Sequence, residues 1–261
     1  EYATSVEEVL TRAFLRDLGM QYVTGLPWDH PAHRRYVNWL VTFFAHIAKR
    51  NGLVVGVLGT PKSKRTRIRG RGRNTVVVED ADERGHEDDG PPIQIVEEIV
   101  TNQLLGVALV FPPRALITRD MIKKAYMEVG PSPIREHANL YDTFARTRSN
   151  AWSEVADRAH EKATSNPHFY LQYIGVHPAY QGNGIGGRIL EHLIRLAERH
   201  ADWRQIYLDT TGGTNPGLYQ HFGFDVTDRM EVEPADCEPF RANGGLIAML
   251  RAAGSTPKSR I

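Results

Sequence analysis

The chain has 261 residues, of which 41% are hydrophobic and 24% charged, and its formal net charge is +1. This composition is typical of a globular protein, and the near-zero net charge excludes a chain steered as a whole towards nucleic acid. No run reaches the ~18 apolar residues that a membrane helix needs, so no membrane partner is expected. Glu7, Glu8 and Arg12 interrupt the first residues, so we also expect no secretory leader there.

Cys237 is the single cysteine of the sequence. It can form neither an internal disulfide nor a thiolate metal site, and we expect no metal cofactor. A lone thiol fits a reducing compartment, so the expected location is the cytoplasm.

The first third of the chain predicts two helices and a strand. Ser5 and Glu8 fit a capping box, which predicts that the first helix starts after Ser5. Apolar residues at helical spacing predict a second helix over about 33–49, which ends at Gly52. The β-rich run 53–58 predicts a strand.

Two blocks of opposite charge come next in the chain. Positions 62–73 hold seven Lys or Arg, and positions 79–89 hold seven Asp or Glu. Such blocks cannot bury enough apolar surface to fold by themselves. We therefore predict one domain over residues 1–261 with an inserted charged loop at about 62–92. The basic run 62–73 has the alternative roles of nucleic-acid binding or a nuclear address, but it lacks interleaved aromatic residues that stack on bases.

Regular structure is predicted again from residue 93 onwards. The runs 93–100 and 104–111 indicate two antiparallel strands joined by a short turn. Helices are predicted over about 119–128 and 134–162, and a turn at Asn166-Pro167 comes after them.

The segment 168–224 is the most informative. Residues 168–176 (HFYLQYIGV) predict a strand, and 177–187 (HPAYQGNGIGG) form a glycine-rich loop. Apolar residues at 185, 189, 190, 193, 194, 196 and 197 predict an amphipathic helix, and 206–210 predict another strand. The first amides of a helix lack internal partners, and glycines let a phosphate approach them. The loop is therefore predicted to bind an anion, most simply a pyrophosphate, and the alternative is a plain loop that starts a helix.

A dinucleotide-binding unit is one candidate for that anion site. Gly182, Gly184 and Gly187 fit its fingerprint, and Asp209 lies near the expected acidic position. Five residues, however, separate the strand from the first glycine, and only 52 residues come after Asp209. A dinucleotide domain needs more βα units than that length allows, so this interpretation is disfavoured.

Residues 176–186 (VHPAYQGNGIG) instead resemble the V-x-P-x-x-[QR]-G-x-G-x-[GA] motif of the GNAT acetyltransferases, and residues 215–224 (NPGLYQHFGF) resemble the family's N-x-x-x-Y-x-x-x-G-F helix. The two motifs cover about a fifth of the chain. The resemblance implies an α/β (α+β) fold with a mixed, largely antiparallel central sheet. It also implies helices on both faces of that sheet and a V-shaped split between the strands at 168–176 and 206–210.

The resemblance also implies acetyl-CoA as co-substrate. The loop amides would hold the CoA pyrophosphate, and the preceding strand would pair with the pantetheine arm. A backbone N–H near Ile174 to Val176 would polarise the thioester carbonyl, and a glycine at 175 allows close approach. Asn215 would bond to the CoA arm, although Asn-Pro at a helix start is also an ordinary N-cap with proline at N1. The implied cofactor-binding residues are Ile174, Gly175, Val176, Gln181, Gly182, Asn183, Gly184, Ile185, Gly186, Gly187 and Asn215.

Tyr219 matches the family's general-acid position, and its alternative role is that of a packed aromatic residue. His168 is the first candidate for the base. It begins the strand, and alternation places it on the same side as Tyr170, Gln172 and Ile174. Several family members place their base at this end of the strand, and the pKa of histidine suits the role. It could equally be a strand-end histidine without a role. The rival bases are Glu97, Glu98, Asp209 and a chain of water molecules.

The expected reaction is acetylation of a small-molecule amine, because the motifs look most like small-molecule-detoxifying members such as puromycin acetyltransferase. Two alternatives stay open. One is acetylation of a protein N-terminus or lysine, and the other is a non-catalytic module that binds CoA or nucleic acid. The sequence identifies neither the acceptor nor the oligomeric state.

Overall fold

The structure is a computed structural model, and it describes residues 2–59, 103–113, 117–133, 146–164, 167–199, 205–233 and 238–256. The predicted charged loop at 62–92 and the predicted strand at 93–100 lie outside these ranges, as do Glu97, Glu98 and Cys237. The chain divides into two compact units, Glu1–Val57 with Leu104–Ile261, and Leu58–Gln103. Of the second unit, only residues 58–59 and 103 lie within the described ranges.

In the described part of the chain, the elements up to residue 163 are mainly helices. The elements there are α1 (Tyr2–Phe14), α2 (Leu18–Thr24), α3 (Pro31–Asn51), β1 (Leu53–Gly59), β2 (Gln103–Phe111), α4 (Arg119–Val129) and α6 (Arg146–Ala163). Asp17 caps α2 by accepting a hydrogen bond from the amide of Met20, and Gly25 ends the helix in the left-handed conformation. Ser5 lies inside α1, so the predicted capping box does not mark the start of that helix.

The second half contains most of the strands. Its elements are β3 (His168–Val176), the 3-10 turn η3 (Pro178–Tyr180), α7 (Ile185–Glu198), β4 (Gln205–Thr211), α8 (Asn215–His221), β5 (Asp225–Met230), α9 (Glu238–Ala242) and β6 (Leu246–Arg251). The bounds of β3 agree with the sequence prediction, and those of α7 and β4 agree to within two residues. Each of these elements has a regular apolar period of its own, which is why the local sequence predicts it.

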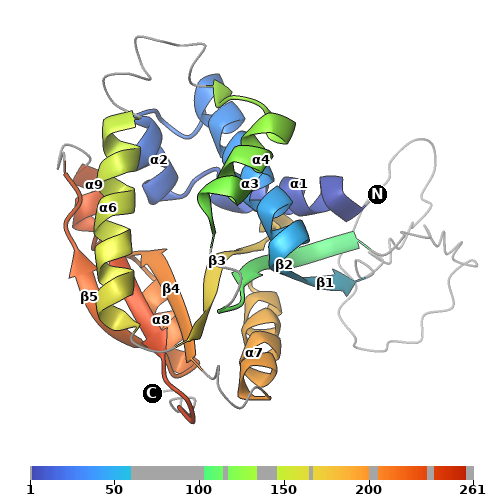
Figure 1. The fold of residues 1–261 in the computed structure, drawn as a ribbon, viewed down its shortest axis with the longest axis vertical. Helices are drawn as coiled ribbons and strands as arrows, with labels where there is room; N and C mark the ends of the chain where they lie inside the picture. Colours follow the sequence, from blue (N-terminus) through green and yellow to red (C-terminus); the bar gives the residue numbers. More distant parts are fainter. Residues whose placement is uncertain are drawn as a thin grey trace, which may run out of the picture. The chain divides into compact units, whose positions relative to one another are not determined.

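One six-stranded sheet with the order β1-β2-β3-β4-β6-β5 forms the centre of the structure (Figure 1). The β2–β3, β4–β6 and β5–β6 pairs are antiparallel, whereas β3 and β4 are parallel. The register of the parallel pair covers only His168–Tyr170 against Gln205–Tyr207, so the two strands separate after their first residues. This is the split predicted between the two central strands.

A shift in register interrupts the pairing of β3 with β2. Leu109 faces Tyr173 and the next residue, Val110, faces Leu171, so Gln172 is an extra residue on β3. A bulge of this kind changes which side chains share a face. Ile174 packs with Leu171 in the core beside α7, so it does not lie on the face of Tyr170 as simple alternation predicts.

Helices cover both faces of the sheet. On one face α7 and α8 bury Phe169, Leu171, Ile206 and Leu208 of the two central strands. On the other face, α1, α3 and α4 pack on β2 and on Tyr173, while α2, α6 and α9 pack around Tyr207 and β6. The fold is therefore a mixed α/β structure with helices on both faces, as expected.

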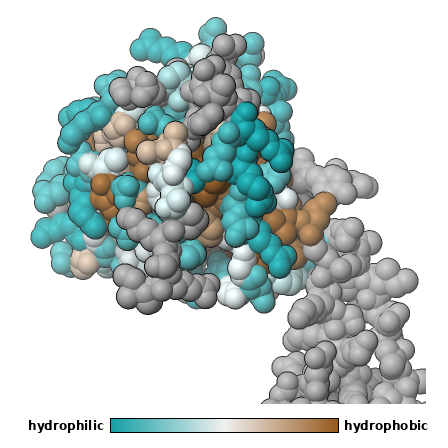
Figure 2. All heavy atoms as spheres, turned by 90° about the horizontal axis from the view of Figure 1, so that it is seen from below, coloured by the Kyte–Doolittle hydropathy of each residue, from teal (hydrophilic) through white to brown (hydrophobic). Residues whose placement is uncertain are grey.

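The face of the molecule drawn in Figure 2 is mainly hydrophilic, with hydrophobic side chains between the polar ones. Three of the large exposed hydrophobic side chains, those of Ile122, Tyr126 and Met127, belong to α4. Within the described ranges, no helix has the length and apolar character needed to cross a membrane.

Candidate active site at the split between the central strands

The glycine-rich loop leads from the end of β3 into α7. Gly182 and Gly184 have φ angles of +80° and +71°, and a Cβ added at either would meet no atom within 4 Å. Gly184 is the N-cap of α7 and forms no side-chain cap, so side chains leave the first amides of this 14-residue helix free. Because those amides point out of the helix start, the loop can accept a phosphate group.

Two predicted binding residues use their side chains to shape this loop. Gln181 donates from Nε2 to the carbonyl of Val176 at 3.1 Å. Asn183 donates from Nδ2 to the carbonyls of Tyr180 and Gln181 at 3.1 and 3.2 Å. Both residues are exposed. In this arrangement their side chains hold the loop conformation.

The next three residues predicted to bind the cofactor, Ile185, Gly186 and Gly187, differ in their surroundings. The side chain of Ile185 is buried in the core, so only its amide is available at the loop. A Cβ on Gly186 would make an ordinary contact with Val176 at 3.7 Å, whereas one on Gly187 would approach the Phe222 ring to 3.2 Å. Gly187 therefore allows α7 to pack closely against Phe222, in addition to any role at the phosphate site.

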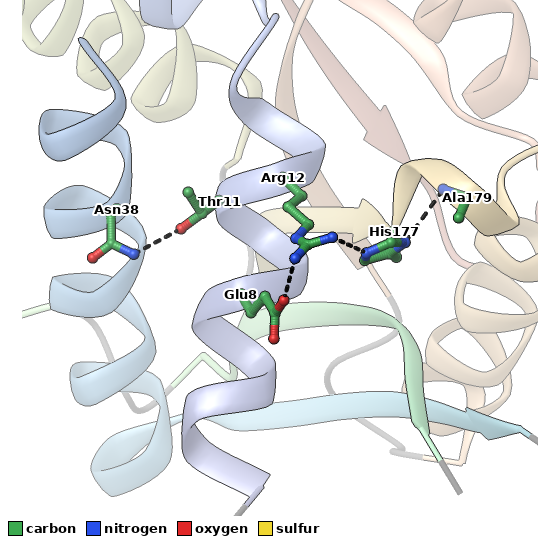
Figure 3. Close-up of polar contacts among 6 residues, drawn as sticks. All are labelled: Glu8, Thr11, Arg12, Asn38, His177 and Ala179. Atoms are coloured by element: carbon green, nitrogen blue, oxygen red, sulfur yellow. Dashed lines mark hydrogen bonds and ion pairs between the residues drawn. The ribbon is translucent and has the colours of Figure 1, made fainter. Parts of the chain in front are cut away.

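A side-chain hydrogen bond connects helix α1 to the start of this loop (Figure 3). Arg12 bonds from Nη1 to Nε2 of His177 at 3.1 Å and pairs with Glu8 at 2.6 Å. Nδ1 of His177 accepts the amide of Ala179 at 3.2 Å, which holds the turn after β3. These contacts place α1 beside the C-terminal end of β3.

The end of β3 carries Ile174, Gly175 and Val176, which pair with β2 on one side only. Their other edge faces the split and has no strand partner in the described part of the chain, although the carbonyl of Val176 already accepts Nε2 of Gln181. The family resemblance implies that Gly175 allows close approach of the co-substrate. A Cβ there would instead meet Ala13 at 2.8 Å and Leu10 at 3.1 Å, so this glycine is required by the packing of α1.

Tyr219 lies on α8, on the opposite face of the sheet from α1. It is buried, and its ring makes an edge contact with Phe224 at a centroid distance of 5.8 Å. Burial raises the pKa of Tyr219 to about 12, while a hydrogen bond with the side chain of Thr210 lowers it and the charge of Asp17 raises it. The phenol is thus next to the last residues of β4 and stays protonated at neutral pH.

Asn215 is the first residue of α8 and is exposed. The N-cap is Thr214, which forms no side-chain cap, and Pro216 is the second helical residue. The predicted arrangement of Asn215 at N-cap and proline at N1 is therefore displaced by one residue.

His168 is brought close to another histidine and not to Tyr219. Its Nε2 lies 2.6 Å from Nε2 of His160 on α6, and both rings contact Tyr207. His168 pairs with Gln205 at the start of β4, and Thr210 comes five residues later, about 16 Å along the strand at ~3.3 Å per residue. His168 is thus at the paired end of the two strands, far from the phenol that it was expected to serve.

Asp209, one of the rival bases, is held by two phenols. Tyr207 donates to Oδ1 at 2.5 Å and Tyr170 donates to Oδ2 at 3.0 Å. Burial raises the pKa of Asp209 to about 6, although both hydrogen bonds lower it. Each oxygen of this carboxylate therefore has a donor already.

A residue that sequence reasoning missed is Asp17, at the start of α2. Its Oδ2 accepts a hydrogen bond from Oγ1 of Thr211, the last residue of β4, at 3.1 Å. The sequence signal was the short run Asp17-Leu18-Gly19, which fits a helix cap but belongs to a helix of only 7 residues. No local pattern connects it with a strand that lies 194 residues further along.

A hollow of about 500 Å³ lies elsewhere, on the surface of α3. It is lined by Arg34, Arg35, Asn38, Trp39, Thr42, Val129, Pro131 and Pro133. None of these residues belongs to β3, β4 or the glycine-rich loop. Among the residues that the structure describes, no three His, Cys, Asp or Glu side chains are grouped so that they could hold a metal ion.

Comparison with known proteins bears on this site directly. Residues 151–226 match the family described as the acetyltransferase (GNAT) domain. The matched segment includes β3, the glycine-rich loop, α7, β4 and α8. A protein of Drosophila melanogaster named probable N-acetyltransferase san is 31% identical over 74 residues, which are 26% of this chain and 40% of that protein. The chain thus matches less than half of that relative's length.

Several solved structures are similar over most of the chain, among them the following two. One, from Corynebacterium glutamicum, is described as histone acetyltransferase HPA2 and related acetyltransferase. It is 16% identical, with 99% of this chain and 93% of that chain covered and a TM-score of 0.46. The other is arylalkylamine N-acetyltransferase 2 from Aedes aegypti, which is 14% identical, with coverages of 96% and 94% and a TM-score of 0.47.

Proposed function

We propose that this chain, whose residues 151–226 match the GNAT acetyltransferase domain, transfers the acetyl group of acetyl-CoA to the amine of a small molecule. The observation that carries the proposal is the split itself. The halves of β3 and β4 that do not pair with each other lie next to a glycine-rich loop. The helix that starts at this loop has no side-chain cap. An extended thioester with a pyrophosphate at one end fits such a site, because it needs both a free strand edge and free amides.

Three parts of the site would share the binding of acetyl-CoA. Amides of the loop from Gly182 to Gly187 would hold the pyrophosphate. The free edge of β3 at Ile174 to Val176 would pair with the pantetheine arm, and Asn215 at the start of α8 would bond to the same arm. The thioester would then lie in the split, between the faces covered by α1 and α8.

Tyr219 would protonate the departing CoA thiolate. A buried phenol that stays protonated at neutral pH is a suitable donor, because the thiolate is the species that forms as the C–S bond breaks. Tyr219 lies beside Thr210, at the end of β4 that does not pair with β3, where the thioester would be. His168 is too far along the strand to act with it directly, and we do not propose it as the base.

The proposal is tested by incubating the protein with acetyl-CoA and a panel of acceptors, and by measuring released thiol. The panel should contain alkylamines, arylamines, a lysine peptide and a peptide with a free N-terminus. Faster turnover of the alkylamines supports the proposal, and turnover of the peptides alone would replace it with protein acetylation. Absence of both thiol release and stabilisation by CoA would refute it.

A further inference from the structure

The segment from the end of α1 to the start of α2 contacts both central strands where these no longer pair with each other. Ala13 of α1 lies against Gly175 of β3, where an added Cβ would be 2.8 Å away. Asp17, at the start of α2, accepts a hydrogen bond from Thr211 of β4 at 3.1 Å. This segment therefore runs past the split on the face opposite to α8.

Asp17 is the carboxylate of that segment. Its Oδ1 accepts the amide of Met20 at 3.0 Å, and its Oδ2 accepts the hydroxyl of Thr211. The residue keeps partial exposure, and in the described part of the chain it forms no ion pair with a lysine or arginine. A carboxylate with partial access and no resident cation can take a cation from a ligand.

The titratable groups around Asp17 come from three further elements: His33 of α3, Tyr173 of β3 and Tyr219 of α8. Burial raises the pKa of Asp17, and hydrogen bonds together with His33 lower it. The pKa of His33 is itself lowered, chiefly by burial, and the pKa values of both tyrosines are raised. Burial thus favours the uncharged forms of the three neighbours, whereas at Asp17 the hydrogen bonds from Met20 and Thr211 favour the carboxylate against burial.

Asp209 is the rival carboxylate on the same face of β4. Its two oxygens accept hydrogen bonds from Tyr170 and Tyr207, just as those of Asp17 accept from Met20 and Thr211, but the charge of Asp209 acts on those two phenols. The charge of Asp17, in contrast, acts on Tyr219, the proposed acid. An acceptor amine must lie between the base and the leaving thiolate, so the carboxylate whose charge reaches Tyr219 is the better placed one.

We propose that Asp17 binds the ammonium group of a primary alkylamine and takes the proton that must leave before the amine can attack. This inference rests on the proposed function, and it narrows the substrate to amines that are protonated in water. It makes Asp17 a catalytic residue on one face of the split and Tyr219 its counterpart on the other.

Every proton of the reaction has a donor and an acceptor. R–NH₃⁺ gives one proton to Asp17, and the neutral amine attacks the thioester carbon. The C–N bond forms, the C–S bond breaks, and the CoA thiolate takes the phenolic proton of Tyr219. The second proton of the nitrogen returns to the phenolate through water, and Asp17 releases its own to solvent. The products are the amide, CoA thiol and one proton.

The test is Asp17→Asn, because asparagine is as good an N-cap as aspartate and removes only the charge. With n-butylamine as acceptor, kcat/KM should fall about 100- to 10,000-fold, the range of general base catalysis. The acidic limb of the parent's kcat/KM profile should disappear in the variant. With aniline, which is already neutral at the assay pH, the kcat/KM of Asp17→Asn should fall much less. Asp120→Asn, an exposed aspartate at the start of α4, is the matched control and should keep parental activity.

Binding supplies a readout that does not depend on turnover. With CoA present, n-butylammonium should raise the melting temperature of the parent and of Asp120→Asn but not of Asp17→Asn. If the parent binds CoA and acetylates no amine, the proposed function fails, and this amine-dependent shift still decides the role of Asp17. Turnover within about threefold of the parent, or an unchanged amine shift in Asp17→Asn, would overturn the inference.

Discussion

Tyr219 and Asp17 each bond to one of two consecutive threonines at the end of β4, and they do so from opposite faces of the sheet. Thr210 bonds to Tyr219, and Thr211 bonds to Asp17. Successive side chains of a strand point to opposite faces, so one strand end can present an acid and a base to the same split. The parallel pairing of β3 and β4 has ended before this point, which leaves room for a ligand between the two groups.

The hydroxyl group of Tyr219 is the first feature to test. Tyr219→Phe keeps the ring and its contact with Phe224 and removes only the proposed proton donor. Turnover should fall about 100- to 10,000-fold while the Kd for acetyl-CoA stays within a few-fold. Steady-state kinetics on any accepted amine measures both. Tyr126→Phe, on the exposed side of α4, is the matched control. Nearly full activity in Tyr219→Phe would make the residue a packing aromatic only.

The loop at the start of α7 makes a prediction about co-substrate binding. CoA at a hundredfold excess over its Kd should stabilise the protein by about 2.7 kcal/mol, and NAD should not. Gly184→Asp should abolish this shift, because it adds a negative charge at the helix start. Gly130→Asp is the control for backbone strain, since Gly130 also has a positive φ of +83° and open space around it. A melting curve that NAD raises and CoA leaves unchanged would favour the dinucleotide interpretation.

Gly175 leads to a prediction about packing. Gly175→Ala places a Cβ against Ala13 at 2.8 Å, so α1 or β3 must shift. We expect a loss of about 1–3 kcal/mol in the free energy of unfolding, as for other overpacked sites. Gly217→Ala, inside α8 with no atom within 4 Å of the new Cβ, should be neutral or slightly stabilising. Denaturant unfolding of the two variants makes the comparison, and equal stabilities would show that α1 does not depend on this glycine.

Much of the fold around the site could be predicted from local sequence. The strand β3 and the helix α7 are predicted by their apolar periods, and the loop between them is predicted by its glycines. The bulge at Gln172 could not be predicted, because it depends on the register with β2 and leaves no mark in the sequence of β3. It is the reason that Ile174 lies on a different face from the one that simple alternation assigns to it.

Residues of the candidate site could be predicted from the sequence only where they belong to a motif. Gln181 to Gly187 and Tyr219 belong to motifs, and the structure places them at the two sides of the split. The base was not recoverable in this way, because its environment is built from distant segments. His168 is a candidate from its position on a strand, yet the length of that strand separates it from Tyr219. Asp17 reaches Thr211 only through the fold.

Asp209 and His160 make a prediction about stability and pH. The folded pKa of Asp209 is raised from 3.8 to about 6, so the native state binds more protons over that range and stability falls as pH rises. The folded pKa of His160 is lowered from 6.5 to about 4, so its contribution rises with pH over nearly the same range. The effect of Asp209 is at most about 3 kcal/mol at 1.36 kcal/mol per pKa unit. The effect of His160 is smaller than its pKa shift alone implies, because solvent screens the partly exposed ring, and in the parent the two effects oppose each other.

Single variants should therefore separate the two contributions. Compared with the parent, Asp209→Asn should gain stability between pH 4 and 6.5 more steeply, because only the histidine effect remains. His160→Asn should lose stability relative to the parent as the pH rises from about 4 to about 6, because only the carboxylate effect remains. Urea unfolding at several pH values gives the slopes. Two variants with parallel pH profiles would show that these groups titrate alike in the folded and unfolded states, and that the contacts of Asp209 with Tyr170 and Tyr207 leave its proton affinity unchanged.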